Sequence, residues 1–294
     1  MATIAFIGLG NMGGPMAANL VKAGHIVRGF DTVPAAREAA RLTGVDASGS
    51  AGEAVRDADV VLTMLPAGRH VTETYRDTLL DAAKPGTLFI DSSTIDVESA
   101  RQAHALAKQK GMASVDAPVS GGVSGAQAAT LTFMVGGDEA AVGRTRPILE
   151  TMGRRVVHCG GPGAGQAAKI CNNMILGISM VAISEAFVLA EKLGLSHRAL
   201  FDVASTSSGQ CWALVNHCPV PNLVPTSAAN HDYRPGFATA LMLKDLTLSQ
   251  EAAGSVGAET ALGRHAMEIY ERFSNAGHQG LDYSAIIEAI RSQS

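Results

Sequence analysis

Lys169 and Asn173 are the residues whose types and spacing most directly suggest chemistry in this chain. They stand four positions apart in GAGQAAKICNN (163–173), and a helix over this stretch puts both on one face near its N-terminal end. The remaining residues of the stretch are mostly Gly, Ala, Ile and Cys, an unusual setting for a lysine. A lysine accepts a proton only when its pKa is lowered, which burial or a second cation achieves.

A second segment, DAPVSGG (116–122), runs from a predicted strand into a turn. The hydroxyl of Ser120 and the consecutive N–H groups of Gly121 and Gly122 can converge there on an anion such as a substrate carboxylate. Ser-Gly-Gly turns also occur without a ligand, so this segment alone leaves both interpretations open.

A glycine-rich loop near the N-terminus predicts a dinucleotide site. The sequence GLGNMG (8–13) has the form GxGxxG and lies between an apolar strand and a helix. The first glycine of this pattern allows a tight turn, the second lets the backbone approach a pyrophosphate, and the third lets the helix pack close to the strand. The helix N-terminus adds unpaired N–H groups for the phosphates. The expected cofactor-binding residues are Gly8, Leu9, Gly10, Asn11, Met12 and Gly13.

Asp31 follows the second predicted strand, where an acid binds the ribose 2′-hydroxyl of NAD and repels the 2′-phosphate of NADP. No arginine comes directly after it, and the next one is Arg37. We therefore predict NAD, although an aspartate here could also be a plain turn residue. The loops after later strands should border the same cofactor, because ligands of open α/β sheets lie outside the carboxyl ends of the strands. These loops contain Met64, Leu65, Pro66 and Thr94.

The elements that must position these residues fall into two halves. Short apolar runs alternate with amphipathic stretches up to the glycine cluster at 160–165, which predicts an α/β Rossmann-type domain with a doubly wound, mainly parallel sheet over residues 1–161. The expected strands are 3–7, 26–31, 60–64, 88–91, 114–117, 131–135 and 155–158.

Residues 162–294 lack a strand signal and predict an all-α domain for substrate binding and oligomerisation. A long interdomain helix is expected over about 166–193, ending at Gly194, which suits a helix C-cap. Shorter helices are expected at 197–204, 238–253, 258–275 and 283–292, with an irregular stretch over 205–236.

Composition excludes several classes of protein. The 294 residues are 47% hydrophobic and 17% charged, and the net charge of −4 without a basic block makes nucleic acid a poor partner. The four cysteines show no CxxC pair and the nine histidines no HExxH pattern, so we expect no metal site and a reducing compartment. The first residues lack the pattern of a signal peptide, and the apolar stretch 174–190 indicates a buried helix, so we expect a cytoplasmic protein without a membrane partner.

The order of the motifs resembles that of the β-hydroxyacid dehydrogenases over essentially the whole chain. The matching motifs are GLGNMG, DAPVSGG, GxGxxxKxxxN and KDL (244–246). This family includes 3-hydroxyisobutyrate, tartronate semialdehyde and 6-phosphogluconate enzymes, and the stretches 207–212, 219–225 and 236–246 resemble the 3-hydroxyisobutyrate branch. His217 and Cys218 depart from that branch.

The resemblance implies roles for individual residues. Lys169 would be the catalytic acid/base, Asn173 would place Lys169 and the substrate hydroxyl, and the Ser-Gly-Gly turn would hold the substrate carboxylate. Thr94 and Lys244 would line the nicotinamide and substrate cleft. Lys244 shares a helical face with Leu241 and Leu248, so it is also a candidate for the second cation. Two aromatic candidates for the substrate site remain: Trp212, either a pocket wall or a core anchor, and Phe237.

The implied activity is NAD-dependent oxidation of a small-molecule 3-hydroxy acid, 3-hydroxyisobutyrate, to methylmalonate semialdehyde, a step of valine and branched-chain amino acid catabolism. One alternative is an NADPH-dependent reductase of tartronate or succinic semialdehyde, against which Asp31 argues. Another is an inactive dehydrogenase-like binding module, which would be expected to lose Lys169. The apolar second half with few charges predicts a homodimer or homotetramer.

Overall fold

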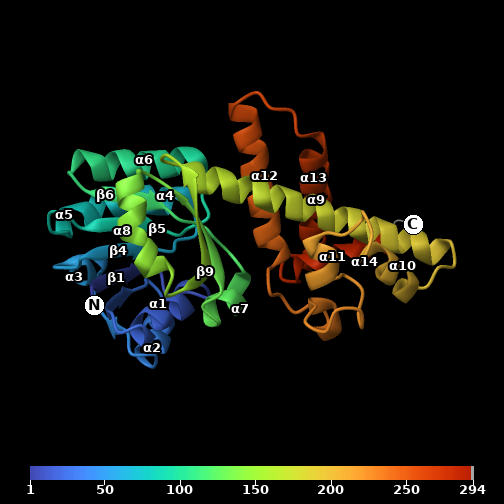
Figure 1. Ribbon diagram of the computed structural model, residues 1–294, viewed down its shortest axis with the longest axis horizontal. Coiled ribbons are helices and arrows are strands. Elements are labelled where there is room, and N and C mark those ends of the chain that lie inside the picture. Colours follow the sequence, from blue (N-terminus) through green and yellow to red (C-terminus); the bar gives the residue numbers. More distant parts are fainter. Residues whose placement is uncertain (293–294) are drawn as a thin grey trace. The chain divides into compact units, whose positions relative to one another are not determined.

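The computed structural model describes residues 1–292, and contacts divide the chain into a dinucleotide unit, Met1–Lys169, and a helical unit that begins at Ile170. Each unit has its own hydrophobic core. Figure 1 shows the strands of the dinucleotide unit and the helices that follow them in the chain. The predicted fold class, an α/β doubly wound sheet followed by a helical domain, is confirmed.

The dinucleotide unit is built on one mixed sheet with the strand order β3-β2-β1-β4-β5-β6-β8-β7, and β9 pairs with the other edge of β8. Pairing is parallel from β3 to β6, whereas β8 runs antiparallel to β6 and β7. The order reverses between β1 and β4, and such a switch point is where open α/β sheets bind ligands. The strands are β1 Thr3–Ile7, β2 Ile26–Phe30, β3 Asp46–Ala47, β4 Val60–Thr63, β5 Leu88–Asp91, β6 Ala113–Asp116, β7 Val119–Ser120, β8 Leu131–Gly136 and β9 Gly153–Gly160.

Alternate residues of the strands face two different hydrophobic clusters, as the period of two along a strand requires. In β1, Ile4 and Phe6 pack with Met16 of α1, while Ala5 and Ile7 join the cluster on the other face. Burial on both faces explains why the strands of this parallel region read as continuous apolar runs. The helices of the unit are α1 Gly13–Lys22, α2 Pro34–Arg41, α3 Ala51–Val55, α4 Gly68–Thr74, a π-helical turn Tyr75–Leu79, α5 Leu80–Ala82, α6 Val97–Gln109, α7 Gly122–Gln127 and α8 Glu139–Leu149.

The helical unit packs around one core cluster that includes Met180, Phe187, Leu246 and Tyr270. Gly194, with a φ of 74°, follows the long helix α9, and the side chain of Ser196 caps α10 by accepting from the N–H of Ala199. The elements are α9 Ala164–Lys192, α10 His197–Ala204, α11 Trp212–His217, a 3₁₀ turn Ala228–His231, α12 Thr239–Ser255, α13 Ala261–Phe273, a π-helical turn Ser274–His278, a 3₁₀ turn Tyr283–Ala285 and α14 Ile286–Ser292.

Three details differ from the sequence-based expectations. The stretch 205–236 is not wholly irregular, because it contains α11 and a 3₁₀ turn, both too short to show a helical period. The two-residue strands β3 and β7 were not expected, because they are defined by pairing with β2 and β8 rather than by local pattern. Contacts divide the chain inside α9 rather than ahead of it, because Gly163 and Gln166 at the start of α9 are bonded to Asp116 of β6 and to the loop after β5.

Helix α9 is long and apolar enough to cross a membrane by length and composition alone. Half of its most apolar 18-residue window is buried inside the protein. A core helix of a soluble protein passes the same test, so this property by itself is weak support for a membrane span.

Candidate functional site

The loop from β1 to α1 has the conformation that its glycines predict. The N–H of Gly8 donates to the carbonyl of Phe30 (2.8 Å), and Gly8 has a φ of 97°, which other residues rarely adopt. A Cβ at Gly13 would overlap the carbonyl oxygen of Gly8, so only glycine lets α1 start this close to β1. A Cβ at Gly10 would meet nothing within 4 Å, which leaves its backbone open to a phosphate. The loop therefore suits a pyrophosphate at the N-terminus of α1.

Asp31 lies directly after β2, and its carboxylate is tied to this loop. Its Oδ2 accepts from the N–H of Leu9 and its Oδ1 accepts from the N–H of Val33, each at 2.8 Å. The sequence did not reveal that Arg37 folds back beside Asp31, where its Nη1 donates to the Asp31 carbonyl and its guanidinium lies 5.7 Å from the ring of Phe30. The only hint in the sequence was that Arg37 follows Asp31 by six residues, in the first part of the expected helix.

The loops after β4 and β5 are bonded to each other. The N–H of Leu65 donates to Oγ of Ser93 (2.8 Å), and Ser93 Oγ in turn donates to Asp91 Oδ1 (2.6 Å). Thr63 Oγ1 also donates to Asp91 Oδ1 (2.7 Å). Burial raises the pKa of Asp91 to about 6, although these hydrogen bonds oppose the shift. Thr94 therefore sits on a loop whose position is set by buried bonds, next to the switch point of the sheet.

The Ser-Gly-Gly segment joins β7 to α7. Ser120 pairs in register with Thr132 of β8 and is half-buried, and Gly121 has a φ of 135°. Helix α7 begins at Gly122. The hydroxyl and the two following N–H groups thus lie at the end of a strand and the start of a short helix, the arrangement expected for an anion site.

Lys169 and Asn173 are both buried, with 7% and 2% of their surface exposed, one turn apart in the first part of α9. Nδ2 of Asn173 donates to Oδ2 of Asp245, which lies next to Lys244 on α12. Sequence reasoning did not pair Asp245 with Asn173, because the two are 72 positions apart. The Asn173 Oδ1 accepts from Nδ2 of Asn172 (3.0 Å), so both ends of the amide are held in one orientation. An amide oxygen has two lone pairs and can accept a second hydrogen bond.

Lys244 is half-buried, and Leu241 of the same helix face is 48% exposed. The buried residues of α12 are Thr239, Met242, Asp245, Leu246 and Ser249, and Lys244 is not among them. The role expected for Lys244 stays a prediction.

Trp212 and Phe237 are brought together by a cluster around Tyr283, which we call the His217 stack. The rings of Trp212 and His217 lie parallel at 6.2 Å, those of His217 and Tyr283 lie parallel at 5.1 Å, and Phe237 meets Tyr283 edge-on at 5.8 Å. Trp212 is 59% exposed, so it is not a core anchor.

A buried carboxylate holds this stack in place. His217 Nε2 lies 2.7 Å from Asp282 Oδ1, and Asp282 Oδ2 accepts from the N–H of Phe237 (3.1 Å). Burial alone would raise the pKa of Asp282, but hydrogen bonding and the charge of His217, with help from Ser284, hold it below its usual value. The departure noticed at His217 is thus part of the packing around two predicted substrate residues.

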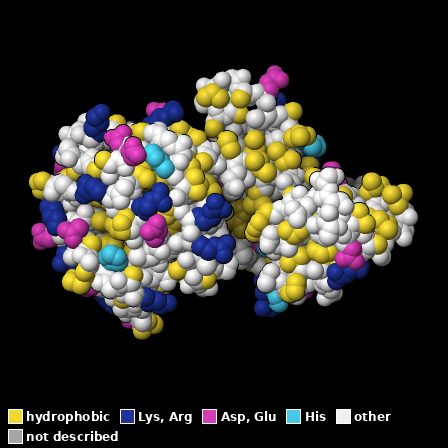
Figure 2. Space-filling view, in the orientation of Figure 1, with side chains coloured by type: hydrophobic (Ala, Val, Ile, Leu, Met, Phe, Trp, Pro, Cys, Tyr) yellow, Lys and Arg dark blue, Asp and Glu magenta, His cyan; other side chains and the backbone are white. Residues whose placement is uncertain are grey.

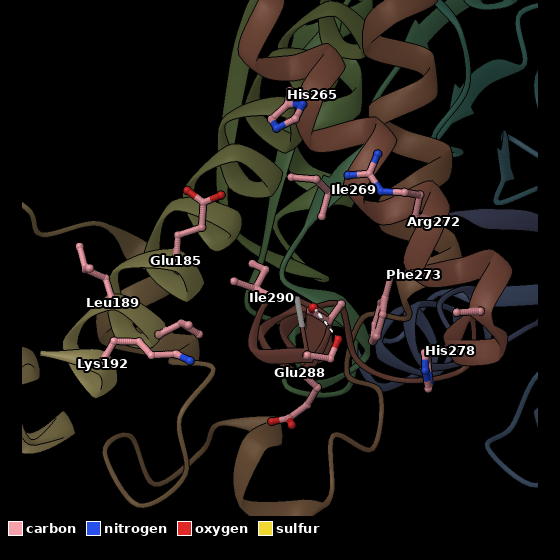
Figure 3. Close-up of a pocket in the computed structure, with 14 residues that line it drawn as sticks. Glu185, Leu189, Lys192, His265, Ile269, Arg272, Phe273, His278, Glu288 and Ile290 are labelled. Atoms are coloured by element: carbon pink, nitrogen blue, oxygen red, sulfur yellow. Dashed lines mark hydrogen bonds between the residues drawn. The ribbon is translucent and has the colours of Figure 1, made fainter. Parts of the chain in front are cut away.

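A groove of about 800 Å³ lies elsewhere in the helical unit, between the later part of α9, α13 and α14 (Figure 3). Both charged signs border it, with Glu185, Lys192 and Arg272 beside Leu189 and Ile269. None of the predicted site residues lines it, so its size does not make it the reaction site. Within residues 1–292, no group of three or more His, Cys, Asp and Glu side chains is arranged to hold a metal ion.

A glycine-rich phosphate loop at a sheet switch point, an acid after β2, and a buried lysine and amide on one helix define a dinucleotide-dependent oxidoreductase. Comparison with known protein families supports this class. Residues 3–161 match the NAD binding domain of 6-phosphogluconate dehydrogenase, and residues 163–290 match the domain described as NAD-binding of NADP-dependent 3-hydroxyisobutyrate dehydrogenase. The chain belongs to the 3-hydroxyisobutyrate dehydrogenase family of NAD-binding oxidoreductases.

Individual relatives are similar over their full length. A probable 3-hydroxyisobutyrate dehydrogenase of Mycobacterium tuberculosis is 59% identical over 293 residues, covering 100% of this chain and 99% of the relative. An NAD-dependent L-serine dehydrogenase of Pseudomonas aeruginosa is 46% identical, covering 97% of each. A solved structure of the Mycobacterium tuberculosis 3-hydroxyisobutyrate dehydrogenase with L-serine superposes with a TM-score of 0.96 at 59% identity, covering 99% of both chains.

Proposed function

We propose that the protein oxidises 3-hydroxyisobutyrate to methylmalonate semialdehyde with NAD, a step of valine degradation. The observation that carries the proposal is the burial of Lys169 and Asn173 one turn apart at the start of α9. The full-length similarity to 3-hydroxyisobutyrate dehydrogenases supports the choice of substrate. The presence of Lys169 argues against an inactive binding module.

Each predicted site residue has a specific role in the proposed reaction. NAD, when bound, accepts a hydride at C4 of its nicotinamide ring. The neutral Nζ of Lys169 takes the proton of the substrate hydroxyl, and Asn173 orients that hydroxyl. Ser120 and the N–H groups of Gly121 and Gly122 bind the substrate carboxylate. In the reverse direction the charged Lys169 returns the proton to the alkoxide oxygen, so one group serves as base and acid.

NAD rather than NADP is the proposed cofactor. The loop 8–13 fits a pyrophosphate, and the carboxylate of Asp31 lies where a ribose 2′-hydroxyl can donate to it. A 2′-phosphate would meet that negative charge. Two observations favour NADP: Arg37 beside Asp31, and the match of residues 163–290 to a domain of NADP-dependent 3-hydroxyisobutyrate dehydrogenase. The guanidinium of Arg37, however, is bonded to the Asp31 carbonyl and lies over Phe30. Initial rates with both cofactors test this, and a larger kcat/KM with NADP would overturn the assignment.

L-serine is a second candidate substrate. The L-serine dehydrogenase relative and the solved structure with L-serine favour it, and L-serine is itself a 3-hydroxy acid with a carboxylate for the Ser-Gly-Gly turn. The deciding experiment measures kcat/KM for 3-hydroxyisobutyrate, L-serine, glycerate and 4-hydroxybutyrate. We expect the first to exceed the others by at least about tenfold, which corresponds to about 1.4 kcal/mol of transition-state binding. A larger value for L-serine would replace the proposed substrate.

Replacement of the lysine tests the mechanism. Lys169→Ala removes the base, which typically costs about 10² to 10⁴ in turnover. Turnover is measured as NADH formation at saturating substrate, and circular dichroism checks that the variant is folded. A folded variant with more than a tenth of the parent turnover contradicts the assigned role. In the parent enzyme, oxidation should speed up with rising pH, because the neutral amine is the base.

We also propose a homodimer or homotetramer in the cytoplasm. Most of the large hydrophobic side chains that are exposed among the described residues belong to the helical unit, including Ile175, Leu189 and Leu193 of the long helix region. Figure 2 shows hydrophobic side chains spread over the visible face of this unit. Exposed apolar surface of this kind is typical of subunit contacts. Light scattering that gives a monomer mass at micromolar concentration would contradict the assembly.

A further inference from the structure

The first turn of α9 is held by a carboxylate from a different element. Asp116, the last residue of β6, is 1% exposed. Its Oδ1 accepts from the main-chain N–H of Gly163 (2.8 Å), and its Oδ2 accepts from that of Gln166 (2.9 Å). The first N–H groups of a helix have no partner within the helix, so an outside acceptor fixes where the helix begins. Asp116 therefore ties the start of α9 to the sheet.

A histidine braces this carboxylate from the other side. Nε2 of His104, in α6, lies 2.9 Å from Asp116 Oδ1, and Nδ1 of His104 lies 2.8 Å from Oγ of Ser114. Both ring nitrogens are thus engaged, which gives the imidazole and the carboxylate a single arrangement. A Cβ at Gly165 would overlap the carbonyl oxygen of Met134, so the helix start also lies in direct contact with β8.

Gln166 connects the same helix turn to the loop after β5. Its side chain is fully buried, with 0% exposure. Its Nε2 donates to the carbonyl of Ser93 (2.7 Å), and its Oε1 accepts from the N–H of Ile95 (3.2 Å). The amide thus binds the residues on both sides of Thr94, which the proposed function places at the nicotinamide. Because Lys169 follows Gln166 by three positions, one turn of helix carries both side chains.

We propose that Gln166 is a positioning residue of the reaction, whose amide holds the turn that carries Lys169 at a fixed spacing from the Thr94 loop. All of these contacts lie within the dinucleotide unit, Met1–Lys169. The inference rests on the proposed function, in which Lys169 transfers the substrate proton. Misplacement of a reacting group by about 1 Å can cost about 10²-fold in rate, so loss of these bonds should act mainly on the chemical step.

The test replaces Gln166 by an apolar side chain of similar length. Gln166→Met removes both hydrogen bonds, and we expect the single-turnover rate constant for NADH formation from 3-hydroxyisobutyrate to fall at least about tenfold. The Kd for NADH should change less than about threefold, a change of under about 1 kcal/mol. The matched control is Gln250→Met in α12, where the amide also makes two side-chain hydrogen bonds, with Ser249 (3.1 Å) and Thr260 (3.0 Å). Its rate constant should stay within about twofold of the parent value, because Ser249 and Thr260 have no role in the proposed reaction.

A double variant separates positioning from general destabilisation. If Gln166 acts through Lys169, then Lys169→Ala with Gln166→Met should be no slower than Lys169→Ala alone. A multiplied loss in the double variant, or a Gln166→Met rate within twofold of the parent, overturns the positioning role and leaves the proposed function intact. A Lys169→Ala variant that keeps the parent rate overturns the proposed function itself.

A second substitution covers the case in which Gln166→Met does not fold. Gln166→Glu keeps an acceptor for the N–H of Ile95, and in its ionised form it sets a carboxylate oxygen against the carbonyl of Ser93. Because burial favours the protonated form, whose O–H can still donate to Ser93, the rate constant is measured relative to the parent from about pH 6 to about pH 9. This ratio should fall at least about tenfold as the introduced carboxyl group ionises and the bond that joins helix and loop is lost. An unchanged ratio in this variant likewise overturns the proposal.

Discussion

The dinucleotide unit and the helical unit use acidic side chains in different ways. In the first, Asp31, Asp91 and Asp116 stand at or just after the carboxyl ends of β2, β5 and β6, and each accepts main-chain N–H groups of nearby loops or helix starts. In the second, Asp282 and Asp245 accept from the side chains of His217 and Asn173, at separations of 65 and 72 positions. Asp282 also accepts main-chain N–H groups, so the feature that distinguishes the helical unit is the long-range side-chain partner.

The difference has a physical origin. The carboxyl ends of parallel strands meet at one edge, and the loops there must find partners for their N–H groups, so an acid at a strand end meets this need. The interior of a helix satisfies its own backbone, so a buried acid on a helix, such as Asp245 of α12, is matched by a side chain. The dinucleotide unit should therefore be most sensitive to changes near its backbone turns, and the helical unit to loss of side-chain pairs.

The largest effect is expected in the dinucleotide unit, for Gly13→Ala. The new Cβ overlaps the Gly8 carbonyl, and overpacking of this kind costs about 3 kcal/mol. Thermal unfolding without cofactor measures the loss. Gly10→Ala is the matched control, because its Cβ meets nothing within 4 Å. It should leave the melting temperature unchanged while weakening NAD binding. Equal stability of the two variants would mean that the backbone contact does not restrict this turn.

His217→Phe tests the helical unit. The ring should still stack between Trp212 and Tyr283, but the buried carboxylate of Asp282 loses its hydrogen-bond partner, at a cost of about 2 kcal/mol in unfolding free energy. Because His217 helps to hold the pKa of Asp282 below its usual value, this contribution is present above about pH 4 and is lost as the pH falls through the lowered pKa. Urea unfolding at pH 7 and pH 3 should show a larger difference between variant and parent at pH 7. A constant difference would contradict the ion pair.

Asp31→Ala tests whether an acid at the end of a strand contributes to cofactor binding. Removal of the carboxylate should weaken NAD binding about tenfold, or about 1.4 kcal/mol, with little change in turnover at saturating NAD. The affinity for NADP should weaken less or improve, since the repulsion of its 2′-phosphate is gone. Isothermal titration with both cofactors measures this. An equal loss for the two would show that Asp31 acts only through its bonds to Leu9 and Val33.

Asp91→Asn should give the smallest change in stability, and that change should depend on pH. The pKa of Asp91 is raised to about 6 by burial, so its contribution favours the folded state at low pH and is lost as the pH rises through 6. From pH 5 to pH 7 this amounts to about 1 kcal/mol for a shift of this size. The stability of the parent relative to Asp91→Asn should therefore decrease by that amount between the two pH values. Parallel stability curves would show that Asp91 does not titrate in this range.

Much of the dinucleotide unit could be predicted because its signals are local. The turn at Gly8, the acid after the second strand and the alternation of apolar runs each lie within a few residues of the element they define. The glycine-rich turn and the position of Asp31 after the second strand were predicted in this way, and their roles in cofactor binding stay predictions. The short strand β7 and the contact of Arg37 with Asp31 were missed, since both depend on where the chain folds back.

The helical unit was harder to predict in detail. Its main helices follow from apolar spacing and from caps such as Gly194 and Ser196. Helix α11 was missed because six residues are too few to show a period. The exposure of Trp212 and the partial burial of Lys244 on α12 depend on which helix face meets the core, and the neighbouring elements determine that face.

The class of fold, the glycine-rich turn after β1, and the lysine and amide one helical turn apart follow from the sequence, because these depend on spacing along the chain. The bonds of Asp116 and Gln166 at the start of α9, of Asp245 to Asn173 and of Asp282 to His217 appear only in the folded structure. Hydrogen bonds between distant residues leave no periodic trace in a sequence, because their geometry exists only after the strands and helices have packed.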